Sequence, residues 1–171
     1  MPYADELLEH ASRLLQPGGR SIAEADVRRA VSSAYYALFH LLVEAGTNLL
    51  CPEQPVELRA QFKRAFVHSD MKKVCKQFET GKKASMSSTL RNLLTEPVEP
   101  ELLEVAKAFV DLQAMRHQAD YVLDSPISST EAAIHVAKAK EAFQCWQAIH
   151  ATNNAKAFVT ALLLDRHWRR D

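Results

Sequence analysis

The sequence predicts an all-α protein, organised as an up-and-down antiparallel bundle of about five helices in a single domain over residues 1–171. Apolar residues recur at spacings of three and four through most of the chain, which is the period of an amphipathic helix. No segment alternates apolar and polar residues for long enough to form a half-buried strand, and the chain holds only four glycines. With 171 residues, of which 47% are hydrophobic, the chain is long enough to bury a core.

The first two helices are predicted at residues 4–16 and from residue 21 to about residue 46. The first ends at a Pro-Gly-Gly sequence, because proline disfavours helix in the residue before it and glycine turns readily. Ser21 and Glu24 have the spacing of a capping box, so we expect them to open the second helix. Its apolar stripe is typical of a bundle seam and consists of Val27, Val31, Ala34, Leu38, Leu41 and Ala45.

The middle of the chain predicts a third helical region at residues 56–78, with a break near residues 68–70. Residues 81–88 combine glycine, lysine and serine, and they predict a mobile loop. A fourth helix follows two closely spaced prolines and is ended by Pro126.

The last part of the chain predicts a fifth helix and a final amphipathic segment. Ser128 and Glu131 form a second capping box, which opens the fifth helix. Two consecutive asparagines at residues 153–154 interrupt the pattern, and the final segment follows them.

Composition excludes several classes of protein. Lysine plus arginine and aspartate plus glutamate number 21 each, so the whole-chain charge does not indicate a nucleic-acid coat protein or a membrane binder. The longest apolar run, residues 35–43, is too short to span a bilayer, and the acidic N-terminus does not resemble a secretion signal. The cysteines and histidines lack the close spacing of metal ligands. We therefore expect a cytoplasmic protein with reduced thiols, no metal and no cofactor.

Arg116 is the most informative candidate, because it occupies a position of the fourth helix's seam where the other members are apolar. A buried guanidinium without a partner costs several kcal/mol, so a carboxylate, a phosphate or polar groups should meet it. Asp120 lies one turn further along nearly the same face. The pair is a candidate binding site, although an ion pair that only fixes helix register would show the same pattern.

The second helix carries a polar line away from its seam. Its members are spaced by three or four residues: Arg29, Ser33, Tyr36, His40 and Glu44. A guanidinium, hydroxyls and an imidazole in one row could contact a phosphate or a base. A polar seam between two helices or two subunits is the alternative interpretation.

A local charge excess lies between residues 59 and 91, where nine basic residues face two acidic ones. Flexible cations around the predicted loop could gather phosphates, although charge runs are more often solvated faces. The candidate basic patch consists of Lys72, Lys73, Lys76, Lys82, Lys83 and Arg91.

The sequence RHQADY at residues 116–121, together with two earlier segments, resembles small proteins of the HEPN superfamily (higher-eukaryote and prokaryote nucleotide-binding domains). Residues 28–40, RRAVSSAYYALFH, look like the signature helix, and residues 116–121 supply the R-x-x-A-D-Y motif that follows it. Residues 68–78 add a similar H-x(9)-F spacing. The resemblance implies an up-and-down bundle, a homodimer with paired motif helices, and a part in RNA cleavage, toxin-antitoxin pairs or nucleotide-linked defence.

The chain departs from HEPN ribonucleases at one functional position. Those enzymes carry a histidine after four to six residues beyond the motif arginine, whereas residues 121–123 here are Tyr-Val-Leu. We therefore expect a homodimeric binding module, rather than an enzyme, in which Arg116, Asp120 and Tyr121 line a polar pocket near Tyr36 and His40. Its ligand or partner would be a nucleotide, RNA or a cognate nucleotidyltransferase.

Two alternatives remain open. An atypical metal-independent endoribonuclease would take its general acid or base from His40 or His68, with Arg116, Asp120 and Tyr121 as further catalytic candidates. A structural protein-interaction domain would use the arginine and aspartate pair only to specify assembly.

Overall fold

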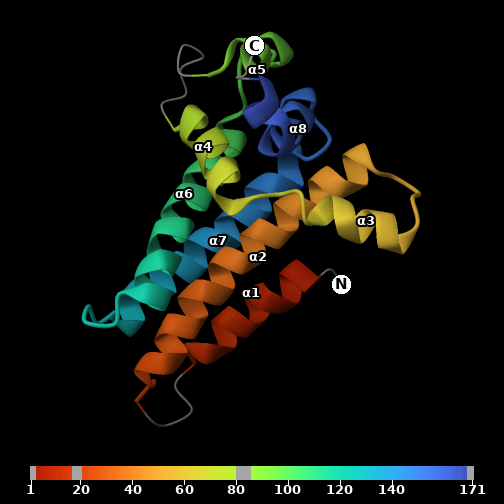
Figure 1. Ribbon diagram of the computed structural model, residues 1–171. Coiled ribbons are helices and arrows are strands. Elements are labelled where there is room, and N and C mark those ends of the chain that lie inside the picture. The colour runs from red at the N-terminus through yellow and green to blue at the C-terminus, as the bar shows by residue number, and fades with distance from the viewer. Residues whose placement is uncertain (1–2, 17–20, 80–85, 169–171) are drawn as a thin grey trace. The chain divides into compact units, whose positions relative to one another are not determined.

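The structure, a computed structural model, describes residues 3–16, 21–79 and 86–168, and every regular element in these ranges is an α-helix (Figure 1). This confirms the predicted all-α class. In chain order the helices are α1 (Tyr3–Leu14), α2 (Glu24–Leu50), α3 (Val56–Lys63), α4 (His68–Phe78), α5 (Ser88–Leu93), α6 (Pro100–Tyr121), α7 (Ser129–Ile149) and α8 (Asn153–Trp168). Among the described helices, none is both long and apolar enough to cross a bilayer.

The chain divides into two compact units. The first unit comprises Met1–Leu41 and Ala108–Gln144, and the second comprises Leu42–Lys107 and Cys145–Asp171. The long helices α2, α6 and α7 contribute residues to both units, whereas α1 belongs to the first and α3, α4, α5 and α8 belong to the second.

The first unit is an antiparallel four-helix arrangement. The ring of Tyr3, at the start of α1, lies 5.1 Å from that of His40, so α1 runs antiparallel to the first part of α2 beside it (Figure 1). Contacts from α2 to α6 run from Ser32 to Asp120 and from Tyr35 to Phe109, which makes this pair antiparallel as well. The core between the first part of α2, the last part of α6 and the start of α7 consists of Val27, Val31, Met115, Ala119, Ile127 and Ala132.

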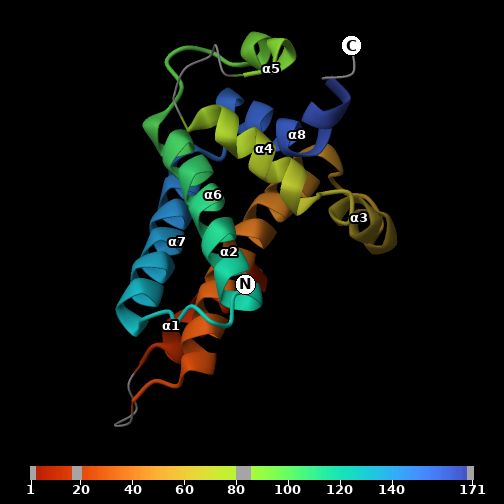
Figure 2. The same ribbon diagram turned by 60° about the vertical axis from the view of Figure 1, so that its left-hand side comes forward.

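The second unit is built around α8, against which both α4 and α5 pack (Figure 2). Phe78 of α4 meets Phe158 of α8 edge to face, with ring centroids 5.1 Å apart. Asn154, only 1% exposed, satisfies its whole amide group here. Its Oδ1 accepts hydrogen bonds from the backbone and side chain of Thr95, and its Nδ2 donates to Thr95 O and Glu99 Oε2.

Of the two predicted capping residues, one is confirmed and the other is not. Ser128 accepts a hydrogen bond from the backbone N–H of Glu131 at 3.1 Å, so the second capping site is confirmed. The prediction for Ser21 was wrong, because α2 begins only at Glu24 and its first turn is closed by the carbonyl of Ala23. Glu24 instead binds a side chain one turn into the helix, as described below.

The predicted loop at residues 81–88 lies mostly outside the described residues, but its end is well anchored. Ser87 caps the short helix α5, and its hydroxyl donates to the buried carboxylate of Asp165 at 2.9 Å. Its backbone N–H donates to the side chain of Gln77 at 2.8 Å. The helix α5 was not predicted, because six residues are too few for a periodic pattern.

Replacing Asn154 by alanine should destabilise the second unit by about 1–3 kcal/mol, because the change leaves buried donors and acceptors without partners. Urea unfolding followed by circular dichroism measures the effect. The exposed neighbour Asn153 provides the matched control, and N153A should shift the free energy of unfolding by no more than about 0.5 kcal/mol. Equal effects of the two variants would contradict the proposed role of the amide network.

His135 makes the stability of the first unit depend on pH. Burial lowers the pKa of this imidazole below 6.5, with a further contribution from Lys138, and its Nδ1 is buried without a hydrogen-bond partner among the described residues. The unfolded chain therefore binds the proton more tightly, so stability falls as pH drops through about 6.5 towards the folded pKa. Thermal unfolding between about pH 7.5 and 5.5 should show a smaller acid-induced loss in H135Q than in the unchanged chain. Parallel curves would refute this role for His135.

Candidate functional site

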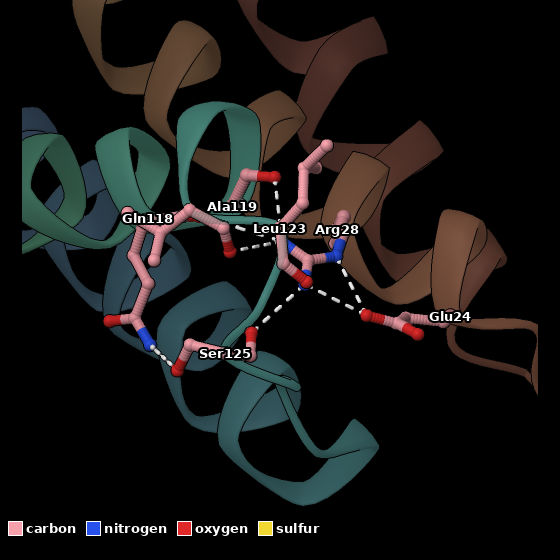
Figure 3. Close-up of polar contacts among 7 residues, drawn as sticks. Glu24, Arg28, Gln118, Ala119, Leu123 and Ser125 are labelled. Atoms are coloured by element: carbon pink, nitrogen blue, oxygen red, sulfur yellow. Dashed lines mark hydrogen bonds and ion pairs between the residues drawn. The ribbon is translucent and has the colours of Figure 1, made fainter.

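The C-terminal end of α6 is held by one side chain from α2. The side chain of Arg28 is 12% exposed, and its Nε and Nη2 both donate to Glu24 Oε1, at 2.9 and 2.8 Å (Figure 3). Its remaining donors reach a group of backbone carbonyls: Nη1 donates to Gln118 O, Ala119 O and Val122 O, and Nη2 donates to Leu123 O and Ser125 O.

These contacts, which we call the Arg28 clamp, supply hydrogen-bond donors to carbonyls at the end of a helix. The last carbonyls of a helix lack partners within the helix and carry partial negative charge, so a cation with several donors stabilises them. Glu24 in turn balances the charge of Arg28. The clamp therefore fixes the backbone on both sides of Asp120 and Tyr121.

Arg116 lies at the centre of a polar and aromatic group. Its Nη2 donates to Tyr36 Oη at 2.7 Å and to Tyr121 Oη at 3.4 Å. Its Cζ lies 5.3 Å from the ring centroids of both these tyrosines and 6.0 Å from that of the buried Tyr35. Three phenol rings thus lie close to the guanidinium.

Asp120 is the carboxylate partner that the sequence predicted for Arg116. Its Oδ2 lies 2.6 Å from Arg116 Nε, in a geometry that makes an ion pair but no aligned hydrogen bond. Its other oxygen accepts a hydrogen bond from Ser32 of α2 at 2.5 Å. Burial by itself lowers the pKa of the guanidinium, but the nearby carboxylate and the two phenols outweigh burial and leave that pKa raised. Arg116 therefore stays charged at every physiological pH.

One edge of the guanidinium remains open. Nη1 of Arg116 forms no hydrogen bond within the described parts of the chain, and the side chain is 21% exposed. Beside it Tyr121 is 61% exposed, and the ring of His117 packs on that tyrosine at a centroid distance of 5.1 Å. The open edge and the exposed ring face solvent together.

The predicted polar line of α2 only partly joins this group. Tyr36 does so through its hydroxyl, whereas Ser33 is only 5% exposed and the contact to α6 comes from Ser32, one residue earlier. His40 packs against Tyr3, Tyr36 and Phe39 and has no described contact with Arg116.

The other two members of the line lie elsewhere. Arg29 is exposed. Glu44 belongs to the second unit, where it pairs with Arg59 and Lys63. The sequence analysis did not identify Arg28 and Ser32, although Arg28, Ser32 and Tyr36 follow one another at intervals of four residues, which was a visible signal.

The predicted basic patch belongs to the second unit and is partly neutralised. Lys73 pairs with Asp70 at 3.0 Å, and Arg166 of α8 approaches the same carboxylate at 3.6 Å. Lys76 and Arg91 are exposed and Lys72 is half-buried. Lys82 and Lys83 lie outside the described residues.

The remaining candidate chemistry is limited. His68 is the first residue of α4 in the second unit, outside the unit that contains Arg116. Within residues 3–16, 21–79 and 86–168, no group of three or more metal-ligating side chains comes together. The arrangement around Arg116 offers a fixed cation, an open donor edge and an exposed phenol ring, which suits recognition of an anion joined to a flat apolar group. No family model, curated protein or solved structure matches the chain.

Replacing Arg28 by alanine should lower the free energy of unfolding by about 2 kcal/mol, because charge-assisted hydrogen bonds to the end of α6 are lost. R28K keeps the charge but not the forked donors, so it should recover only part of the loss. Urea unfolding measures both variants. R29A, the exposed neighbour, is the matched control and should change stability by less than about 0.5 kcal/mol. If R28A were as stable as R29A, the clamp would not hold α6.

Proposed function

We propose that the chain is a binding module for a nucleotide or RNA, with Arg116 as the residue that receives the phosphate. The observation that carries the proposal is the open Nη1 edge of a guanidinium whose other groups are already held. Because Tyr36, Asp120 and Tyr121 fix its plane, the side chain loses little entropy when an anion arrives. Planar, fixed guanidinium groups are well suited to phosphate oxygens.

The permanent charge of the Arg116 guanidinium favours a binding role over a catalytic one. The raised pKa of Arg116 prevents it from transferring a proton at neutral pH. Asp120 is occupied by an ion pair and by the hydroxyl of Ser32. His117 packs on the ring of Tyr121, with ring centroids 5.1 Å apart, and the described contacts of Arg116 do not include it.

The resemblance to HEPN proteins extends the proposal. As a HEPN-like protein the chain would work as a cytoplasmic homodimer, as the HEPN member of a toxin-antitoxin or defence pair, with a nucleotidyltransferase-type protein as partner. The antiparallel order of the first unit and the position of the R-x-x-A-D-Y motif at the end of α6 support this proposal.

The proposal predicts that R116Q weakens binding of a fluorescently labelled single-stranded RNA by about thirtyfold or more at about 50 mM salt, because the open cationic edge of the candidate site is removed. Fluorescence anisotropy with RNA, and competition by ATP or ADP, measure the effect. R116K retains the charge without the forked donors and should bind about tenfold more weakly.

Arg13 supplies the matched control, because it forms an exposed ion pair with Glu9 in the same unit and with the same spacing. R13Q should leave affinity unchanged. Absence of binding by the unchanged chain at low salt would remove the proposal. Loss of stability or dimerisation in R116Q, with every ligand inert, would instead assign the ion pair a structural role.

A further inference from the structure

Both arginines of the candidate site are already paired with carboxylates. Arg116 pairs with Asp120, and Arg28 pairs with Glu24. A balanced site attracts a polyanion only weakly, so one phosphate at the Nη1 edge gives a small electrostatic contribution and a shallow salt dependence. Most of the affinity for a ligand must therefore come from another kind of contact.

An exposed apolar surface adjoins the guanidinium. Tyr121, Val122 and Leu123 are 61%, 41% and 73% exposed. Three consecutive exposed apolar side chains are unusual on a protein surface unless they have a function. The Arg28 clamp binds the carbonyls of Val122 and Leu123, so these side chains project from a fixed backbone.

We infer that the ligand presents an unpaired nucleobase, which stacks on the ring of Tyr121 and packs beside Val122 and Leu123, while its phosphate accepts from Arg116 Nη1. This inference rests on the proposed function and specifies which part of the ligand is recognised. Both a single-stranded RNA and a free nucleotide carry this chemistry.

The physical basis is the complementarity of a flat base to a fixed phenol ring beside a cation. Base stacking on an aromatic side chain tolerates any sequence, because every base has a π face. In a duplex the bases are already stacked and paired, so their faces are inaccessible to Tyr121. The site should therefore bind unpaired nucleotides and should bind an RNA duplex only weakly.

The test compares four probes against the full chain by fluorescence anisotropy: labelled octa-adenylate, an abasic backbone of the same length and charge, a blunt-ended RNA duplex, and AMP as competitor. We expect octa-adenylate to bind at least about tenfold more tightly than the abasic strand or the duplex. The logarithm of its affinity should fall with the logarithm of salt concentration with a slope near −0.7, the value for about one phosphate. Competition by AMP at equal affinity would identify a free nucleotide as the source, and weaker competition would identify the strand.

Variants of Tyr121 separate stacking from the phosphate contact. Y121L should weaken binding of octa-adenylate roughly 5- to 100-fold, while Y121F, which keeps the ring, should bind within about threefold of the unchanged chain. Tyr3 has nearly the same exposure, 59%, in the same unit, so Y3L is the matched control and should have no effect.

The two proposals fail in different ways. Equal binding of the abasic strand and octa-adenylate, or full affinity in Y121L, would overturn the stacking inference even if R116Q weakened binding. Absence of binding by every probe, including octa-adenylate, would overturn the proposed function itself.

Discussion

The attachment of Arg28 to the end of α6 is the contact on which the candidate site depends. A helix that ends at Tyr121 leaves its last carbonyls unpaired, and the chain then has to turn before α7 begins at Ser129. Arg28 supplies donors along this turn, from Gln118 O to Ser125 O. Without it the backbone that carries Asp120 and Tyr121 would fray, and the groups around Arg116 would lose their common geometry.

Arg116 shows how a charged residue can occupy a helix seam, because its contacts offset the free-energy cost of burying the charge. The carboxylate of Asp120 supplies the opposite charge, the phenol of Tyr36 supplies a hydrogen bond, and three ring faces supply cation-π contacts. These contacts satisfy part of the guanidinium and leave one edge open to solvent. The same residue thus links α2 to α6 and presents an edge to a ligand.

Much of the architecture could be predicted from the sequence, because helix period and proline positions are local signals. The ion pair between Arg116 and Asp120 was also predictable, since both residues lie one turn apart on the same helix. The contacts between α2 and α6 were not, because the register of two helices depends on packing across the core. The polar line therefore predicts Ser33 where Ser32 makes the contact, and the capping pattern predicts Ser21 although α2 begins at Glu24.

The spacing of the α2 contacts constrains how this part of the chain can change. Arg28, Ser32 and Tyr36 follow one another at intervals of four residues, and each meets a different part of the α6 segment. Inserting or deleting a single residue among them would rotate every later side chain by about 100° around the helix axis. Related sequences should therefore keep the length of this stretch, with gaps displaced to the connections between helices.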